Sequence, residues 1–267
     1  MNALPVMVSI LLHAVALAEQ EPAIPSEVHV STRIGALEAS IATLAGNGDY
    51  DGALDHALLA MEERRSNLPA DAAGLARGIA MVGSLHADME QYRLAIEHLA
   101  EAAQVAERAG LNAAATMYDQ QAETAALYVH VYSALDDGKP DKALGPMQAI
   151  VAARAQRESE APLALAQANN DLAFVLILNG QCTRGQRLAE AALLTRQDAL
   201  PAGHPKLAES WLCVAGTAAC LGWDAESQAA YVAGVRAWSQ GPLSRLREPP
   251  SYLAVTKAYP RVTSSAR

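Results

Sequence analysis

The sequence predicts an all-α protein, an α-solenoid of about five helix-turn-helix repeats, and three observations carry that prediction. Hydrophobic residues make up 51% of the 267 positions but aromatic residues only 4%, and the abundant alanine and leucine lose little rotamer freedom in helices. Short turn segments recur at intervals of 42, 48, 42 and 42 residues. Their first residues are Gly48, Glu90, Gly138, Gly180 and Gly222. Small residues keep fixed distances from these turns, so the repetition extends into the flanking helices.

Ten helices are expected, in five antiparallel pairs, with each recurring turn joining the two helices of a pair. The expected ranges, in order, are 31–46 and 50–66, 71–88 and 92–109, 111–136 and 140–158, 161–179 and 183–199, and 204–221 and 224–240. The helix-breaking residues between them are Pro69, Gly110, Pro140, Pro162, Pro201 and Pro242. Because one pair cannot bury its apolar face, neighbouring pairs are expected to stack into one continuous core.

The third repeat departs from the pattern. Pro140 stands where the first two repeats have Tyr50 and Tyr92, and six additional residues precede its turn. We therefore expect a lengthened helix at about 113–135.

Small residues around the turns predict close contact between the two helices of a pair. In the second repeat these residues are Gly83, Ala95 and Ala102, and in the fifth they are Ala215, Ser227 and Gly234. Larger side chains at these places would force the helices apart. Tyr50 and Tyr92 are expected to fill the space where the helices meet beside the turn.

These residues resemble the tetratricopeptide repeat, a helix-turn-helix unit. The segment NGDYDGALDHALLAM, 47–61, matches its turn and second helix, and Trp211 stands at the place of the family's tryptophan. The 42-residue interval is similar to the longer kinesin-light-chain type, in which the loop between repeats often carries His-Pro, as His204-Pro205 does here. The resemblance covers roughly 31–240 and is weakest in the third repeat. With the N-terminal segment described below, it points to a bacterial exported protein.

The resemblance implies that the first helices of the pairs line a groove that receives a peptide or protein partner. Carried over by register, the groove residues are Arg77, Ser84, Tyr128, Tyr132, Gln167, Asn170, Phe174, Glu209 and Cys213. The three aromatic residues among them would form an apolar patch with a polar edge, which suits a protein interface. Alternatively, these three side chains complete the core between helices. The run Asn169–Asp171 is expected at the start of a first helix, where asparagine side chains can bind a peptide backbone.

No pattern in the sequence indicates catalysis or metal binding. It contains no phosphate-binding loop, GxSxG elbow or HExxH helix. His56 and His98 lie 42 residues apart at equivalent places, but no third ligand accompanies them, so both are expected to be exposed. We therefore expect no catalytic residue, no metal and no cofactor.

The net charge of −9 and the pI of about 5.2 argue against nucleic acid as a partner, since phosphate binding needs a basic surface. The balance reverses after Gly241, where five basic residues accompany one acidic residue. The segment 241–267 is expected to be a capping segment followed by a flexible basic tail.

The N-terminus has the pattern of a secretory signal peptide. Apolar residues run from Leu4 to Leu17, and small residues flank Leu17 in a small-x-small cleavage pattern. The segment is short for a membrane span of about 20 residues. It has no lysine or arginine, which a signal peptide usually carries at its start, so an uncleaved anchor or a buried helix is the alternative. The expected organisation is a signal peptide 1–18, a linker 19–30 and the solenoid 31–240. This organisation predicts a periplasmic or secreted protein without a membrane span after cleavage.

Export would let disulfides persist, and the chain has three cysteines. Cys213 and Cys220 are seven residues apart on one expected helix. That spacing is about 10.5 Å at 1.5 Å per residue, beyond the roughly 7 Å limit between bridged Cα atoms. Cys182 and Cys220 both lie at the edge that carries the turns within pairs. An intramolecular disulfide, if one forms, is expected to be Cys182–Cys220; the alternative is that Cys220 points into the groove.

Three functions are compatible with this organisation. The expected one is a non-catalytic interaction scaffold or adaptor that binds a partner peptide or protein in its groove. The alternative is a regulatory helical subunit of a separate enzyme, or of a secretion or envelope complex, which would co-purify with it. An enzyme with an unrecognised site would need convergent acid and base groups in the structure. The sequence names neither the partner nor the oligomeric state.

Overall fold

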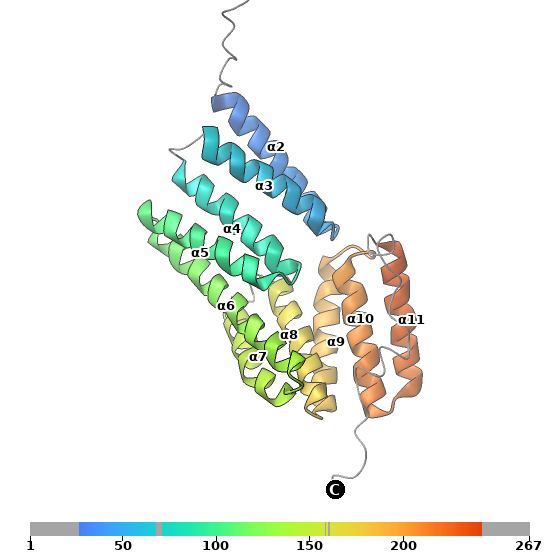
Figure 1. Cartoon of the computed structure of the whole chain (residues 1–267). Coiled ribbons are helices and arrows are strands. Elements are labelled where there is room, and N and C mark those ends of the chain that lie inside the picture. Colours follow the sequence, from blue (N-terminus) through green and yellow to red (C-terminus); the bar gives the residue numbers. More distant parts are fainter. Residues whose placement is uncertain (1–26, 68–70, 158, 160, 242–267) are drawn as a thin grey trace, which may run out of the picture.

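The computed structural model describes residues 27–67, 71–157, 159 and 161–241, and all the expected helices are present in it (Figure 1). They are α2 (Glu27–Gly46), α3 (Tyr50–Asn67), α4 (Ala72–Asp88), α5 (Tyr92–Arg108), α6 (Asn112–Asp136), α7 (Pro140–Ala155), α8 (Pro162–Leu178), α9 (Cys182–Ala199), α10 (Pro205–Leu221) and α11 (Asp224–Gln240). The described residues contain no strand, so the prediction of an all-α solenoid is confirmed.

The first helix starts earlier than expected. α2 begins at Glu27 instead of residue 31, and Val30 already packs into the core with 3% of its surface exposed. The expected linker therefore ends before Glu27. The predicted signal peptide, and the basic tail beyond Gly241, lie outside the described residues.

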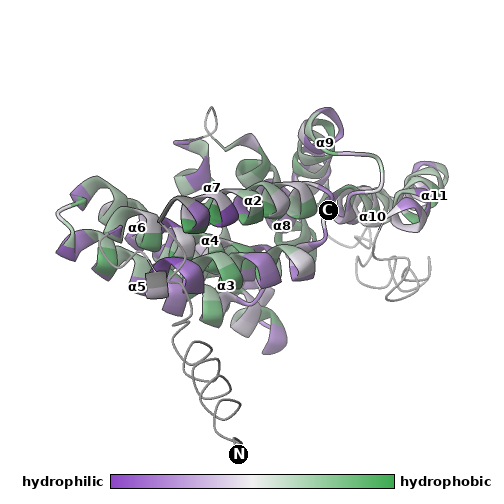
Figure 2. Cartoon of the chain, turned by 90° about the horizontal axis from the view of Figure 1, so that it is seen from above, coloured by the Kyte–Doolittle hydropathy of each residue, from purple (hydrophilic) through white to green (hydrophobic). Residues whose placement is uncertain are grey.

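Consecutive helices pack against each other along the chain and form five antiparallel pairs (Figure 1). α10 also contacts α8, so the first helices of the last two pairs lie side by side. Hydrophilic and hydrophobic residues share each helix (Figure 2), as expected where neighbours bury only part of its surface. None of the described helices has the length and apolar content needed to cross a membrane.

The feature that repeats is a left-handed residue just after the first helix of each pair. The residues with positive φ at these five places are Gly48, Glu90, Gly138, Gly180 and Gly222, and Gly110 repeats the conformation after α5. In each turn the following N–H donates to a carbonyl five residues earlier, as from Gln91 to His86 at 2.8 Å. This is the Schellman arrangement, which caps the C-terminus of a helix. The regular intervals in the sequence therefore mark five copies of one capping motif.

Small residues bring the two helices of a pair together. A Cβ atom added to Gly83 of α4 would lie 2.9 Å from Cγ of Leu99 on α5. One added to Gly185 of α9 would lie 2.9 Å from Cγ1 of Ile177 on α8. Both contacts are closer than a methyl group allows, so these positions require glycine unless the neighbour moves.

The core runs through the stacked pairs. One cluster of buried residues extends from Ile41 of α2 to Leu176 of α8, and a second joins Ala173 of α8 to Trp238 of α11. The third pair contains the longest helix, α6, with 25 residues, as its additional residues predict. α6 contributes Tyr128 to this core and spans the middle of the stack.

The first repeat also touches the last. Gly48 lies against Pro205 at the start of α10, where an added Cβ atom would overlap the proline ring. Tyr50 and His204 pack edge to face with ring centroids 6.1 Å apart. His204 is buried, and its Nδ1 accepts a hydrogen bond from the Lys206 N–H at 3.1 Å. The stack therefore curves until its first and fifth repeats meet at this contact.

Candidate functional site

A cavity of about 270 Å³ lies between α6, α8 and α10, three successive first helices. The groove residues that line it are Tyr128, Tyr132, Gln167, Asn170, Phe174, Glu209 and Cys213. Glu90 and Asp171 are its other charged or polar lining residues, and the remaining lining is apolar. We call this space the aromatic cavity. It gathers all but two of the residues for which the resemblance implies a place in the groove.

The other two, Arg77 and Ser84, lie elsewhere on α4. Arg77 is exposed, and its charge acts on Tyr118 of α6. Ser84 lines a second cavity of about 350 Å³ that borders the aromatic cavity at Tyr128 and Gln167. The repeat register predicted a groove position for Arg77. However, α4 lies one repeat further from α8 than α6 does, so Arg77 lies outside the aromatic cavity.

Tyr128 and Tyr132 line one side of the aromatic cavity, and both stack on a third tyrosine. Tyr92 of α5 stacks on Tyr128 with ring centroids 4.6 Å apart and on Tyr132 at 5.6 Å. Burial raises the pKa of all three hydroxyls, which therefore stay neutral. Tyr128 is buried and completes the core, as the alternative expected, whereas Tyr132 and Phe174 keep part of their surface exposed.

Asp171 anchors a hydrogen-bond network beside these tyrosines. The Tyr128 hydroxyl donates to Oδ2 of Asp171 at 3.0 Å, and Nε2 of Gln167 donates to Oδ1 at 2.8 Å. Burial raises the pKa of Asp171 to about 6, although the hydrogen bond from Gln167 acts in the opposite direction. The carboxyl group thus fixes the positions of two lining side chains.

Gln167 continues the network to Arg196 of α9, whose surface is 1% exposed. Arg196 Nη2 donates to Gln167 Oε1, and Nη1 donates to Ser210 Oγ at 2.6 Å and to the Lys206 carbonyl at 2.7 Å. These bonds make a buried cation tolerable. Glu209 Oε2 lies 3.4 Å from Lys206 Nζ and 4.0 Å from Arg196 Nη1. The network ties α6, α8, α9 and α10 together around the cavity.

One buried polar atom in the cavity lining lacks a partner. Asn170 is 8% exposed, and its Oδ1 accepts no hydrogen bond from any residue that the structure describes. Cys213 Sγ donates to the backbone carbonyl of Asn170 at 3.7 Å and leaves the side-chain oxygen unpaired. A buried acceptor without a donor costs about 1–3 kcal/mol. This acceptor is enclosed by the protein next to the aromatic cavity.

Glu90, Asp171 and Arg196 are charged residues of this site that the sequence prediction did not assign to the groove. The run Asn169–Asp171 lies in the middle of α8, not at its start as expected. Asp171 follows Gln167 by four residues, a spacing that places two side chains on one helix face. Arg196 follows the buried Leu193 by three residues, but it has the appearance of an ordinary basic residue near a helix C-terminus.

The two equivalent histidines are not free on the surface as expected. His98 of α5 stacks on His86 of α4 with ring centroids 5.3 Å apart, and burial lowers the pKa of His98. His56 Nδ1 shares a hydrogen bond of 2.8 Å with Ser40 Oγ of α2. Both therefore face the first helix of their own pair. Among the described residues, no group of three potential ligands could hold a metal ion.

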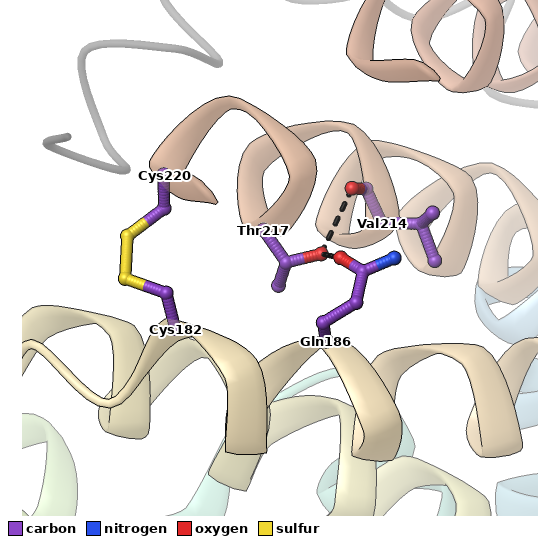
Figure 3. Close-up of a disulfide and its surroundings, with 5 residues drawn as sticks. All are labelled: Cys182, Gln186, Val214, Thr217 and Cys220. Atoms are coloured by element: carbon purple, nitrogen blue, oxygen red, sulfur yellow. Dashed lines mark hydrogen bonds between the residues drawn. A yellow bond between two sulfur atoms is a disulfide. The ribbon is translucent and has the colours of Figure 1, made fainter. Parts of the chain in front are cut away.

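A disulfide joins Cys182 at the start of α9 to Cys220 near the end of α10 (Figure 3). Their Cα atoms are 6.0 Å apart. Beside it, the Thr217 hydroxyl donates to the Gln186 side-chain oxygen, which forms a second link between the same two helices (Figure 3). Cys220 thus lies at the edge that carries the turns, away from the aromatic cavity, while Cys213 lines that cavity as a buried thiol.

Comparisons with known proteins yield no family and no function. No family model matches the chain, and no curated protein matches it. Among solved structures, two crystal structures of a Podosopora anserina protein, provisionally described as a kinesin light chain with nearly identical TPR-like repeats, are similar. One of them carries a glutamine-to-methionine substitution. Both are 15% identical to this chain with a TM-score of 0.39. The matches cover 78% of this chain, and 95% of the substituted protein and 96% of the other. BtubC (BKLC) from P. vanneervenii is 14% identical with a TM-score of 0.43, over 97% of this chain and 94% of its own. At these values the similarities carry no argument about function.

Proposed function

We propose that this chain is a non-catalytic interaction scaffold that binds a peptide, or an extended segment of a protein partner, in the aromatic cavity. The observation that carries the proposal is the aromatic cavity itself. Partly exposed Tyr132 and Phe174 line it together with the polar residues Gln167 and Glu209. Large aromatic anchors with a polar edge are typical of the energetic centre of protein interfaces.

The rigidity of the surroundings supports this function. The side chains that position the lining are held by the network from Tyr128 through Asp171 and Gln167 to Arg196. A site that is ordered before binding loses less conformational entropy when a ligand arrives. The aromatic cavity is therefore suited to bind a partner without rearrangement of the helices around it.

Export to the periplasm or the cell exterior is part of the proposal. It rests on the apolar stretch from Leu4 to Leu17 with its cleavage pattern after Ala18. The Cys182–Cys220 disulfide fits the same location, because such bonds persist in oxidising compartments.

A display library of random dodecapeptides, selected against the full chain, tests the proposal. We expect enriched peptides whose binding is lost in Phe174→Ala, because that substitution removes an aromatic wall of the aromatic cavity. Trp223→Ala is the matched control, since Trp223 is 47% exposed in the α10–α11 turn outside that cavity. Enriched peptides that bind Phe174→Ala and the unmodified chain equally would contradict the proposal.

A further inference from the structure

The charged groups that line the aromatic cavity all have the same sign. They are Glu90 in the α4–α5 turn, Asp171 of α8 and Glu209 of α10. The lining of the neighbouring cavity has more positive than negative charges, since it contains Arg154, Arg196 and Lys206 but only Asp88 as an acidic residue. The two cavities border each other at Tyr128 and Gln167, so a change of sign occurs across these two side chains.

The three acidic groups differ in how far they are already neutralised. Glu209 is partly neutralised, because its carboxylate lies within ion-pair distance of Lys206 and Arg196. Asp171 accepts hydrogen bonds from Tyr128 and Gln167, which are neutral donors. Glu90 is exposed and forms no ion pair with any described residue. Two of the three carboxyl groups thus lack a cation at contact distance.

Apolar side chains supply the rest of the lining. Tyr132 and Phe174 present aromatic rings, and Val131, Leu135 and Leu212 present aliphatic surface. A guanidinium group interacts favourably with aromatic faces, and the methylene stem of an arginine packs well on aliphatic surface. An arginine side chain therefore matches the aromatic and the acidic groups at once.

We propose that the aromatic cavity takes an arginine side chain of the partner peptide. Its guanidinium would face Glu90 and Asp171 and pack against Tyr132 and Phe174. The inference rests on the proposed function, since it names the chemical class of ligand for the same site. It excludes acidic peptides from this cavity, because Glu90, Asp171 and Glu209 would repel them.

The test uses a dodecapeptide enriched by display on the full chain, and its counterpart with citrulline in place of arginine. Citrulline keeps the shape of the side chain but removes the charge. Isothermal titration calorimetry is expected to show at least about tenfold weaker binding of the citrulline peptide, the loss of a charge-assisted hydrogen bond. Enriched peptides that need Phe174 but contain no arginine would overturn this inference and leave the proposed function intact. If no enriched peptide needs Phe174, both are overturned.

A substitution in the chain makes the assignment specific. Glu90→Gln should weaken the arginine peptide roughly two- to fivefold and leave the citrulline peptide unchanged, whereas Glu226→Gln on the exposed face of α11 should change neither. Unchanged affinity of Glu90→Gln for the arginine peptide would overturn the inference.

Discussion

Glu90 has the backbone conformation that the other four repeats give to glycine. Its φ is 61°, and residues with a side chain pay about 1 kcal/mol for this left-handed region. We expect Glu90→Gly to raise the free energy of unfolding by about 0.5–1 kcal/mol, after allowance for the greater freedom of glycine in the unfolded chain. Urea unfolding measures it, with Glu90→Gln as the control that keeps the strain. Equal stability of Glu90→Gly and Glu90→Gln would contradict the expectation.

Asp171 should make stability depend on pH in a predictable direction. Burial raises its pKa from 3.8 to about 6, so between these values the folded chain binds a proton that the unfolded chain has released. The stabilising contribution is complete below pH 3.8 and is lost as pH rises through about 6. Asp171→Asn cannot titrate and avoids this loss. From pH 5 to pH 7, the free energy of unfolding of Asp171→Asn should rise by on the order of 1–2 kcal/mol relative to that of the wild-type chain.

Unfolding by urea at pH 5, 6 and 7 measures this difference. The other titrating groups, including His204, are common to both proteins and cancel in the comparison. Parallel stability profiles for the wild-type chain and Asp171→Asn would show that Asp171 keeps an ordinary pKa.

Site residues at repeating positions could be predicted from the sequence, whereas the members of the buried hydrogen-bond network could not. Tyr132, Asn170, Phe174 and Glu209 could be selected because equivalent places in successive repeats face the same way. Arg196 could not, because its role depends on partners from two other helices that have no fixed distance from it in the sequence.

Close contact between the helices of a pair determines which residues the second repeat tolerates. Gly83 approaches Leu99 too closely for a Cβ atom, whereas one added to Gly145 in α7 would meet nothing within 4 Å. We expect Gly83→Leu to cost roughly 1–3 kcal/mol through overpacking. Gly145→Ala should instead add about 0.5–1 kcal/mol, because alanine favours the helix. Thermal unfolding of both variants decides, and a Gly83→Leu variant as stable as the wild-type chain would disprove the packing.

The disulfide connects helices of two adjacent repeats. Cys182 and Cys220 are separated by 38 residues. Closing a loop of this size removes conformational entropy from the unfolded chain and so raises its free energy by about 2–4 kcal/mol. The double substitution of both residues by alanine should lower stability by that amount. Peptide mapping of protein isolated without reductant should recover the linked pair. Alkylation of both thiols in that sample would contradict the bond.

Helices could be predicted almost completely from the sequence, because each is bounded by a local signal. Glycine or proline separates the elements at every junction except that of α4 and α5, and the Schellman turns determine where first helices end. The start of α2 was missed because nothing repeats ahead of the first turn to set a register. Its extension to Glu27 depends on burial of Val30.

The shape of the whole molecule is the part that the sequence could not provide. The contact of Gly48 and Tyr50 with the segment at His204 and Pro205 is the sum of small rotations between successive pairs. No single repeat encodes that sum. The same contact borders the cavity that Ser84 and Lys206 share, which is lined by residues from α2 to α10.

Hydrogen exchange of the full chain, with and without a dodecapeptide enriched by display, locates the surface that binds the partner. If the partner binds in the aromatic cavity between α6, α8 and α10, exchange should become slower at 128–135, 167–175 and 209–213, the segments that carry Tyr132, Phe174 and Glu209. Protection confined to the second helices α5, α9 and α11, with these three segments unchanged, would contradict binding in that cavity.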